Sequence, residues 1–289
     1  MKSYLKKAYC INEDFRIYAA ITTDIVKYAQ ECFNLWPSSC EALGRVLTIG
    51  AIMSCTYKNN DFINIKVNTT GPLGKIVVEG NDGNVRGFVE NPGVFLVNND
   101  GTLNITKAIE SGDIQVIKDL HLREPFVSSS EIIKGDITND FTYYFTKSEQ
   151  IPSSVGLQVS FGEDDKVKSA GGFLIQVMPG AKEESIKTLE ENLKNLKPIT
   201  KMIDEGYEAE DIINEITKGD YKILETKELN YKCNCSKERF ERGLMTLKED
   251  DLEDILNTDH KCEITCNFCN KKYVFDENDL KNIILKIKK

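Results

Sequence analysis

Four cysteines near the C-terminal end of the chain constrain its fold more than any other feature. They form two close pairs, Cys233-Asn234-Cys235 and Cys266-Asn267-Phe268-Cys269, separated by thirty residues. Two thiolates with one or two residues between them can point both sulfurs at one ion. Two such pairs complete a tetrahedral site with Zn–S distances of about 2.3 Å. We therefore predict that Cys233, Cys235, Cys266 and Cys269 bind one Zn²⁺ in the reduced protein.

Such a zinc site has two interpretations that the spacing alone does not separate. Four protein ligands close the coordination shell, so the metal would not activate water for hydrolysis. The site could be a static structural zinc. It could also be a redox switch, because zinc holds the sulfurs as thiolates and oxidants attack thiolates. In that case Cys266 and Cys269 could close a local disulfide once the metal leaves.

Composition and charge narrow the class of protein. The formal net charge is -9 and the pI is about 5.0, which argues against a nucleic-acid binder, since neutralising phosphates needs surplus Lys and Arg. Nine cysteines, an odd number, do not suggest a secreted disulfide framework. No segment has the apolar core of a signal peptide or the roughly eighteen apolar residues of a membrane span. We expect a cytoplasmic protein that does not bind membranes.

Residues 1–180 show the pattern of an α+β domain with helices packed on antiparallel sheet. The residues from Phe15 to Thr22 alternate as in a strand, Thr23 is placed to cap a helix, and a second helix is expected from about Ser38 to Ser54. Asp136 is placed to cap a further helix. Gly-rich turns separate the other expected strands, at 61–69, 75–79, 85–90, 93–98, 102–108, 114–119, 155–161 and 171–177.

The rest of the chain is predicted to form a helical linker, 181–231, and a small zinc-binding domain, 232–289. Ile186, Leu189, Leu193 and Leu196 make one apolar stripe in the linker, whose other face is highly charged. Such a segment is helical only while its stripe has a surface to pack on, so it is a candidate for local unfolding. An ordinary helical linker fits the composition equally well. The last 58 residues contain few large apolar groups, so metal binding is expected to supply much of their stability.

The order and spacing of several motifs, over essentially the whole length, resemble the redox-regulated chaperones of the heat-shock protein 33 family. The most specific are Cys233-Asn234-Cys235-Ser236 with Arg239, and Cys266-Asn267-Phe268-Cys269-Asn270 followed by Tyr273 and Phe275. Further matches lie upstream: Gly71-Pro72-Leu73-Gly74, Val85-Arg86-Gly87, Tyr144 with Ser148-Glu149-Gln150-Ile151-Pro152, and Gly171-Gly172 with Gln176 and Pro179.

The resemblance implies a holdase that works without ATP and is inactive while reduced and zinc-bound. It implies that Cys233, Cys235, Cys266 and Cys269 are the zinc ligands, and that oxidation pairs Cys233 with Cys235 and Cys266 with Cys269 and releases the metal. The C-terminal domain would then unfold, the linker would loosen, and exposed apolar surface would bind unfolding client proteins. The family also implies a homodimer in the active state and no enzymatic activity.

The remaining cysteines and the two histidines are not expected to belong to the metal site. Cys262, four residues before Cys266, matches no ligand position of the family and is expected to be a bystander, and His260 is expected to be a surface residue at the entry to a strand. His121 has no evident catalytic companion, so a structural role is favoured. Cys10 receives no role, and three further cysteines are interpreted as small core residues, Cys32, Cys40 and Cys55.

Two competing functions stay open. A thiol–disulfide oxidoreductase could use Cys266 and Cys269, although no thioredoxin-like βαβ pattern surrounds them and closed zinc ligation would block them. A zinc-ribbon adaptor could bind RNA or protein, although the acidic balance disfavours RNA.

Overall fold

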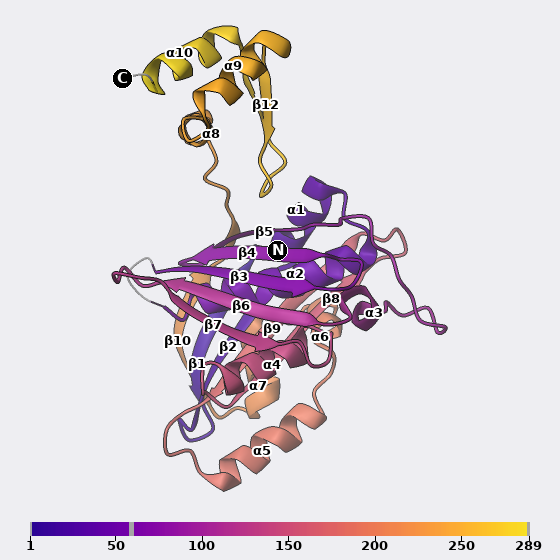
Figure 1. Cartoon of the computed structure of the whole chain (residues 1–289). Helices are drawn as coiled ribbons and strands as arrows, with labels where there is room; N and C mark the ends of the chain where they lie inside the picture. Colours follow the sequence, from indigo (N-terminus) through magenta and orange to yellow (C-terminus); the bar gives the residue numbers. More distant parts are fainter. Residues whose placement is uncertain (1, 58–60, 288–289) are drawn as a thin grey trace. The chain divides into compact units, whose positions relative to one another are not determined.

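The structure is a computed structural model that describes residues 2–57 and 61–287 (Figure 1). Contacts divide the chain into two compact units, residues 1–232 and 233–289. The first unit contains two β-sheets and seven helices among its described residues, and the second contains a hairpin and three helices. The mixed α+β class is therefore confirmed. The segment 181–231 makes its contacts within the first unit, and its release on activation stays a prediction.

The first sheet has five antiparallel strands in the order β10-β1-β2-β9-β8. Their bounds are Tyr4–Cys10 (β1), Phe15–Ile21 (β2), Ser153–Phe161 (β8), Val167–Val177 (β9) and Tyr221–Glu228 (β10). The predicted strands in β2, β8 and β9 are confirmed, and β2 is buried on both faces. β1 and β10 were not predicted, so the segment 181–231 is helical only over its first part.

The second sheet has six strands in the order β11-β5-β4-β3-β6-β7, antiparallel except for the short β11, which runs parallel to β5. The bounds are Phe62–Thr69 (β3), Lys75–Asn81 (β4), Asn84–Val89 (β5), Gly112–Asp119 (β6), Phe126–Glu131 (β7) and Asn230–Tyr231 (β11). β11 ends two residues before Cys233, so the first unit holds the chain close to the start of the cysteine motif.

Two helices occupy the space between the sheets. α1 spans Thr23–Phe33 and α2 spans Pro37–Ser54, and α2 contacts β4 and β5 of one sheet and β8 and β9 of the other. A helix that is apolar almost all round is typical of such a buried position. Gly50 permits the close approach, because a Cβ there would lie 2.7 Å from a methyl carbon of Val78. This layer forms the largest core of the protein.

Two of the expected strands are wrong. Residues 93–98 form no strand beyond one bridge between Val97 and Leu103, and Ile105–Ile109 form the short helix α3. The Asn104 side chain accepts a hydrogen bond from the Lys107 N–H at 2.9 Å and caps this helix. The predicted helix after Asp136 is confirmed as α4, Thr138–Lys147, while the residues before it form the unpredicted β7.

Two helices, α6 (Ile199–Asp204) and α7 (Ala209–Thr217), cover the other face of the five-stranded sheet, and a third, α5 (Glu183–Lys194), packs on α7. They form a second core with β1, β2 and β9. The helix residues fully or almost fully buried there are Leu189, Ile199, Met202, Ala209, Ile212, Ile213 and Ile216. Of the predicted stripe, Leu189 is buried in this core, and Ile186, Leu193 and Leu196 are half-buried against it. The stripe is therefore confirmed, and its helix α5 packs on α7.

The second unit is small. Its elements are α8 (Lys237–Leu244), α9 (Glu249–Thr258), β12 (Cys262–Thr265), β13 (Lys272–Phe275) and α10 (Glu277–Ile287), with β12 and β13 paired as an antiparallel hairpin. Side chains cap two of these helices: the Ser236 hydroxyl accepts from the Arg239 N–H before α8, and the Asp276 carboxylate accepts from the Asp279 N–H at 2.9 Å before α10. The core contains eight buried residues, one of which is Cys266.

Candidate metal centre

Two short segments of the second unit carry the four cysteines. Cys233 and Cys235 lie on the extended residues before α8, whose first turn is fixed by the Ser236 cap. Cys266 and Cys269 lie on the turn between β12 and β13, where the Cys266 carbonyl accepts from the Asn270 N–H at 2.8 Å. Asn270 has a φ of 55°, a left-handed conformation that Asn adopts more readily than most residues. The β12–β13 hairpin and the capped start of α8 therefore bring the two cysteine pairs face to face.

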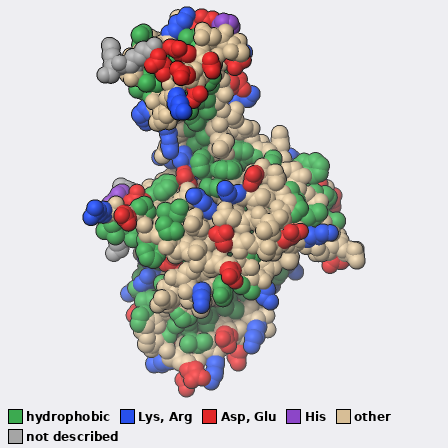
Figure 2. All heavy atoms as spheres, in the orientation of Figure 1, with side chains coloured by type: hydrophobic (Ala, Val, Ile, Leu, Met, Phe, Trp, Pro, Cys, Tyr) green, Lys and Arg blue, Asp and Glu red, His purple; other side chains and the backbone are tan. Residues whose placement is uncertain are grey.

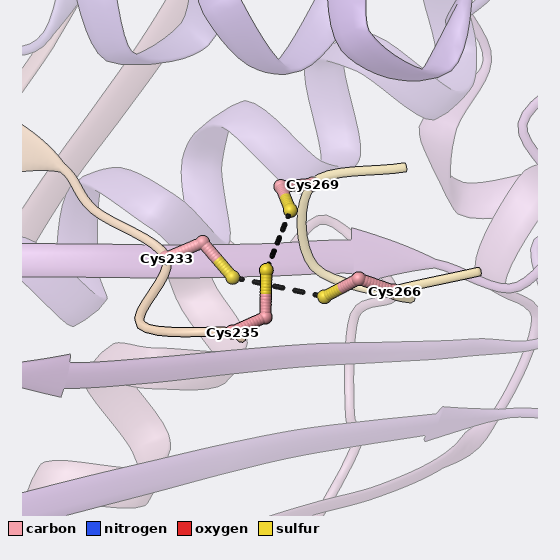
Figure 3. Close-up of side chains that lie close together, drawn as sticks. All are labelled: Cys233, Cys235, Cys266 and Cys269. Carbon is pink, nitrogen blue, oxygen red and sulfur yellow. Dashed lines mark hydrogen bonds between the residues drawn. The ribbon is translucent and has the colours of Figure 1, made fainter. Parts of the chain in front are cut away.

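The four sulfurs form one cluster. All four Sγ atoms lie within 4.8 Å of one another, with 3.7 Å between Cys233 and Cys266 and 3.3 Å between Cys235 and Cys269 (Figure 3). A tetrahedron with Zn–S bonds of about 2.3 Å has sulfur–sulfur edges of about 3.8 Å. The cluster therefore has the size and donor set that Zn²⁺ prefers, and no large rearrangement is needed to hold the ion. The structure brings the four predicted residues together, and their role as ligands stays a prediction.

Tyr273 is a polar neighbour of the cluster for which the sequence suggested no role. Its hydroxyl lies 3.1 Å from the Cys235 sulfur and 3.1 Å from the Cys235 carbonyl oxygen, and its ring packs against Phe240. Hydrogen bonds of this kind orient metal ligands and stabilise negative charge on them. The sequence signal for this contact is the alternation of β13, in which Tyr273 and Phe275 are buried and their neighbours are exposed. This alternation points the Tyr273 side chain inward, beside the turn that carries Cys266 and Cys269.

The thiols differ in acidity. Burial raises the pKa of Cys235, but hydrogen bonds from Tyr273 and the neighbouring thiols outweigh burial and lower it to about 7. Burial raises the pKa of Cys266 and, more strongly, that of Cys269. Without metal, Cys235 is therefore the thiol most easily deprotonated of these three, and a thiolate is the form that binds metal or attacks an oxidant.

The two residues near the second cysteine pair lie outside the cluster. Cys262 is on β12, is not one of the grouped sulfurs, and has a pKa raised by burial and by Asp259. His260 is exposed, with Nδ1 3.3 Å from a carboxylate oxygen of Glu277. The surface position predicted for His260 is confirmed, and the bystander role of Cys262 stays a prediction.

The cysteines of the first unit have different environments. Cys10 and Cys40 are buried, and burial raises the pKa of each to about 12, which makes them poor nucleophiles. Cys55 is half-buried against the main core with a pKa raised by burial to about 11, and Cys32 is also half-buried. The core interpretation thus fits Cys40 best. His121 is exposed in the turn after β6.

The comparisons with known proteins agree over nearly the whole chain. The family model described as "Hsp33 protein" matches residues 3–276. The 33 kDa chaperonin of Bacillus cytotoxicus is 43% identical, covering 98% of this chain and 99% of the relative, and that of Staphylococcus carnosus is 40% identical, covering 98% of each. The crystal structure of the 33 kDa chaperonin (heat shock protein 33 homolog) from Thermotoga maritima superposes with a TM-score of 0.93 at 31% identity, covering 100% of both chains. The chain therefore belongs to the heat-shock protein 33 family.

Proposed function

We propose that this protein is a chaperone that holds unfolding proteins without ATP, and that oxidation of its four clustered cysteines activates it. Membership of the family supports the chaperone class, and the relatives are named chaperonins rather than enzymes. The observation that carries the switch is the four-sulfur cluster inside the smallest core of the protein. A metal held there would stabilise the unit that an oxidant then destabilises.

In the reduced state, zinc would act as part of the core of the second unit. Three of its cysteines are half-buried and the fourth, Cys266, is buried beside Tyr273 and Phe275. For small structural zinc domains, the metal-binding free energy is also folding free energy, on the order of 10–16 kcal/mol. Eight buried residues give little stability of their own, so loss of the metal would unfold this unit.

Oxidation would remove the ligands chemically. Four thiolates and two molecules of peroxide, with four protons, give two disulfides and four molecules of water, and Zn²⁺ leaves because disulfide sulfur is a poor ligand. We propose the pairs Cys233–Cys235 and Cys266–Cys269. Each pair lies within one segment, so no disulfide would link the two segments. The alternative pairing, Cys233–Cys266 and Cys235–Cys269, would link the segments and stabilise the folded arrangement of the unit.

The surface proposed to bind clients is the face of the five-stranded sheet under α6 and α7, on which α5 packs in turn. On the sheet side this face consists of buried apolar residues such as Phe15, Ile17, Ile21, Phe173 and Ile175. The helices that cover it are short and rich in charged residues, so they are stable mainly through this packing. When they detach, a continuous apolar surface would be exposed, of the kind that binds unfolded chains.

The charge of the molecule supports protein clients rather than nucleic acid. The net charge is -9, and α9 begins with Glu249, Asp250 and Asp251. Figure 2 shows acidic side chains gathered on the displayed face of this C-terminal unit. No helix among the described residues is long and apolar enough to cross a membrane. A cytoplasmic location and a homodimer in the active state are proposed from the family resemblance.

Light scattering by a heat-unfolding client protein tests the proposal. The chain is added either reduced and zinc-loaded or after treatment with peroxide. Suppression of aggregation only after oxidation supports the switch. Equal suppression by both forms would mean a constitutive holdase, and suppression by neither would favour a zinc-ribbon adaptor.

A thiol–disulfide oxidoreductase is the second candidate, because the pKa of Cys235 near 7 is typical of reactive dithiols. Reduction of insulin disulfides distinguishes it from the chaperone. We expect the rate to be the same with and without the protein, since closed metal ligation removes the free thiolate. Clear turnover would favour the oxidoreductase.

A further inference from the structure

A pocket of about 540 Å³ lies at one end of the five-stranded sheet, within the first unit. It is lined by the start of β2, the end of β9 and the residues before β8, namely Arg16, Gln150, Ile151, Pro152, Gln176, Val177, Met178 and Pro179. The volume is within the range of about 300–1,000 Å³ that is usual for small-molecule sites. The family motif residues Gln150-Ile151-Pro152, Gln176 and Pro179 meet here, although none of them belongs to the metal centre.

The pocket is preformed by backbone hydrogen bonds. The Val177 N–H donates to the Pro152 carbonyl at 3.0 Å, the Ile151 N–H donates to the Phe145 carbonyl at 3.1 Å, and the Met178 N–H donates to the Asp14 carbonyl at 2.9 Å. These bonds satisfy the backbone of the lining segments. The backbone around the pocket is therefore already ordered, so ligand binding would cost little conformational entropy of the protein.

Arg16 gives the pocket a positive charge without a carboxylate partner. Among the described residues it forms no ion pair, and its buried Nε–H has no acceptor. Its neighbours are two neutral phenols, Tyr9, whose hydroxyl accepts from Nη2 at 3.4 Å, and Tyr18. The guanidinium carbon lies 5.6 Å from the centre of the Tyr9 ring, which fixes its position. The carboxylate of Asp14, nearby in sequence, instead accepts from the Ser185 hydroxyl at 2.5 Å.

Two carboxamides flank this charge, and the remaining wall is apolar. Gln176 is directly opposite Arg16 in the β2–β9 register, so the two side chains emerge on the same face of the sheet. Neither Gln176 nor Gln150 makes a side-chain hydrogen bond to another described residue. Ile151, Pro152, Val177 and Met178 supply the apolar lining. A few convergent polar groups on an apolar wall are typical of a ligand site.

From this geometry we propose that the pocket binds an organic carboxylate that carries an apolar group. A planar guanidinium with unused N–H groups matches a carboxylate, which accepts two parallel hydrogen bonds. The two carboxamides can donate to the same oxygens, and the apolar wall receives the substituent. A free small acid and the terminal carboxylate of a peptide with an apolar last residue share this chemistry.

Titration of octanoate into the full-length, reduced, zinc-loaded protein tests the site, with octanamide as the uncharged counterpart. Calorimetry or NMR should show octanoate binding at least about tenfold more tightly than octanamide, because a hydrogen-bonded charge pair is lost with the amide. Equal binding of both compounds, or of neither, would overturn the proposal.

Three variants locate the binding. Arg16→Gln should lower octanoate affinity at least about tenfold, whereas Arg123→Gln, which removes an exposed Arg elsewhere in the first unit, should not. Gln176→Glu places a carboxylate opposite Arg16 and should also abolish binding, which keeps the test decisive if Arg16→Gln fails to fold. Unchanged affinity in Arg16→Gln and Gln176→Glu would refute the assignment.

A second arm distinguishes the sources of the carboxylate. A short peptide ending in leucine is compared with its C-terminally amidated form. Binding of the free form alone, lost in Gln176→Glu, would identify chain ends as ligands. Binding of octanoate without either peptide would identify small acids.

Discussion

At the scale of single residues, the second unit depends on sulfurs that belong to its core and that are proposed to bind the metal. Cys266 has only 4% of its surface exposed and packs with Tyr273 and Phe275. The sulfur of Cys269 lies 3.3 Å from the sulfur of Cys235, which belongs to the other cysteine segment. Removing one of these thiols would therefore remove a proposed metal ligand and a contact between the two segments at once.

The variant Cys269→Ser should weaken zinc binding strongly and loosen the second unit, because a serine hydroxyl stays protonated at neutral pH and is a poor ligand for zinc. Competition with a chromogenic zinc chelator measures the affinity. Cys262→Ser is the matched control, since Cys262 lies on β12 outside the sulfur cluster, and it should keep both zinc and activation. Unchanged zinc content in Cys269→Ser would remove this residue from the ligand set.

At the scale of elements, the helices α5–α7 and the sheet depend on each other. Ile212, Ile213 and Ile216 of α7 face the sheet, as does Met202 of α6, whereas the adjacent Lys201 is exposed. Short helices of this kind are not stable in isolation. The packing on β1, β2 and β9 therefore decides whether this segment is folded.

Met202→Ala should partly detach α6 and α7 from the sheet. Deletion of a fully buried methionine side chain typically lowers the free energy of unfolding by about 2–5 kcal/mol. Hydrogen exchange of the amides in α6 and α7 should accelerate, and the reduced protein should gain activity in the light-scattering assay. Lys201→Ala, on the exposed face of the same helix, should change neither. Faster exchange without any gain in activity would move the client surface away from this face.

Acid should loosen the packing of the helices α5 and α7 on the rest of the first unit. Asp14 accepts from Ser185 of α5, and this bond lowers the pKa of its carboxyl; Glu210 of α7 is paired with Lys6, which lowers the pKa of Glu210. A lowered folded-state pKa gives stability that is present above the unfolded values of about 3.9 and 4.3 and is lost as pH falls through the folded value. NMR signals of α5 and α7 should therefore shift below about pH 4 before those of the main core.

Two variants should reproduce this effect at neutral pH. Asp14→Asn and Glu210→Gln remove the carboxylates, while Glu183→Gln on α5 removes only an exposed pair with Lys187 and should leave the helices in place. Loss of the main core signals together with those of α5 and α7 would contradict the local effect.

The elements that the sequence predicted best are those whose pattern is local. Alternation predicted β2 and β3, and the position of Asp136 predicted the start of α4. β1 is interrupted by Lys6 and Lys7, and β10 is mostly exposed, so neither shows clear alternation, and each is a strand because the other pairs with it. The strand expected at 102–108 is a helix because Ile105, Ala108 and Ile109 bury a face at helical spacing beside the Asn104 cap.

At the scale of the whole molecule, the chain contains one unit with extensive cores and one with a small core. The cluster of four sulfurs could be predicted because its cysteines lie in two short motifs. The pocket around Arg16 could not, since it joins residues near positions 16, 150 and 176 that only the sheet register brings together.

Removal of zinc should therefore unfold the two units unequally. After chelation of the metal from the reduced protein, amides of α8–α10 should exchange rapidly while those of β3 and β4 stay protected, because only the second unit would rely on a metal held by the four cysteines. Hydrogen exchange with mass spectrometry resolves these segments. Persistent protection of α8–α10 without zinc would show that the small core is sufficient.

The order of strands in the five-stranded sheet has a consequence for synthesis on the ribosome. β2 and β9 can pair once residue 177 has emerged, but the helices that cover their apolar face end at residue 217. At about 5–20 residues per second, the intervening stretch takes roughly 2–8 s to make. During synthesis, each copy therefore exposes for seconds the apolar face of β2 and β9 that the helices cover in the finished protein. This exposure needs no oxidant. In that interval, the nascent protein can contact other unfinished chains.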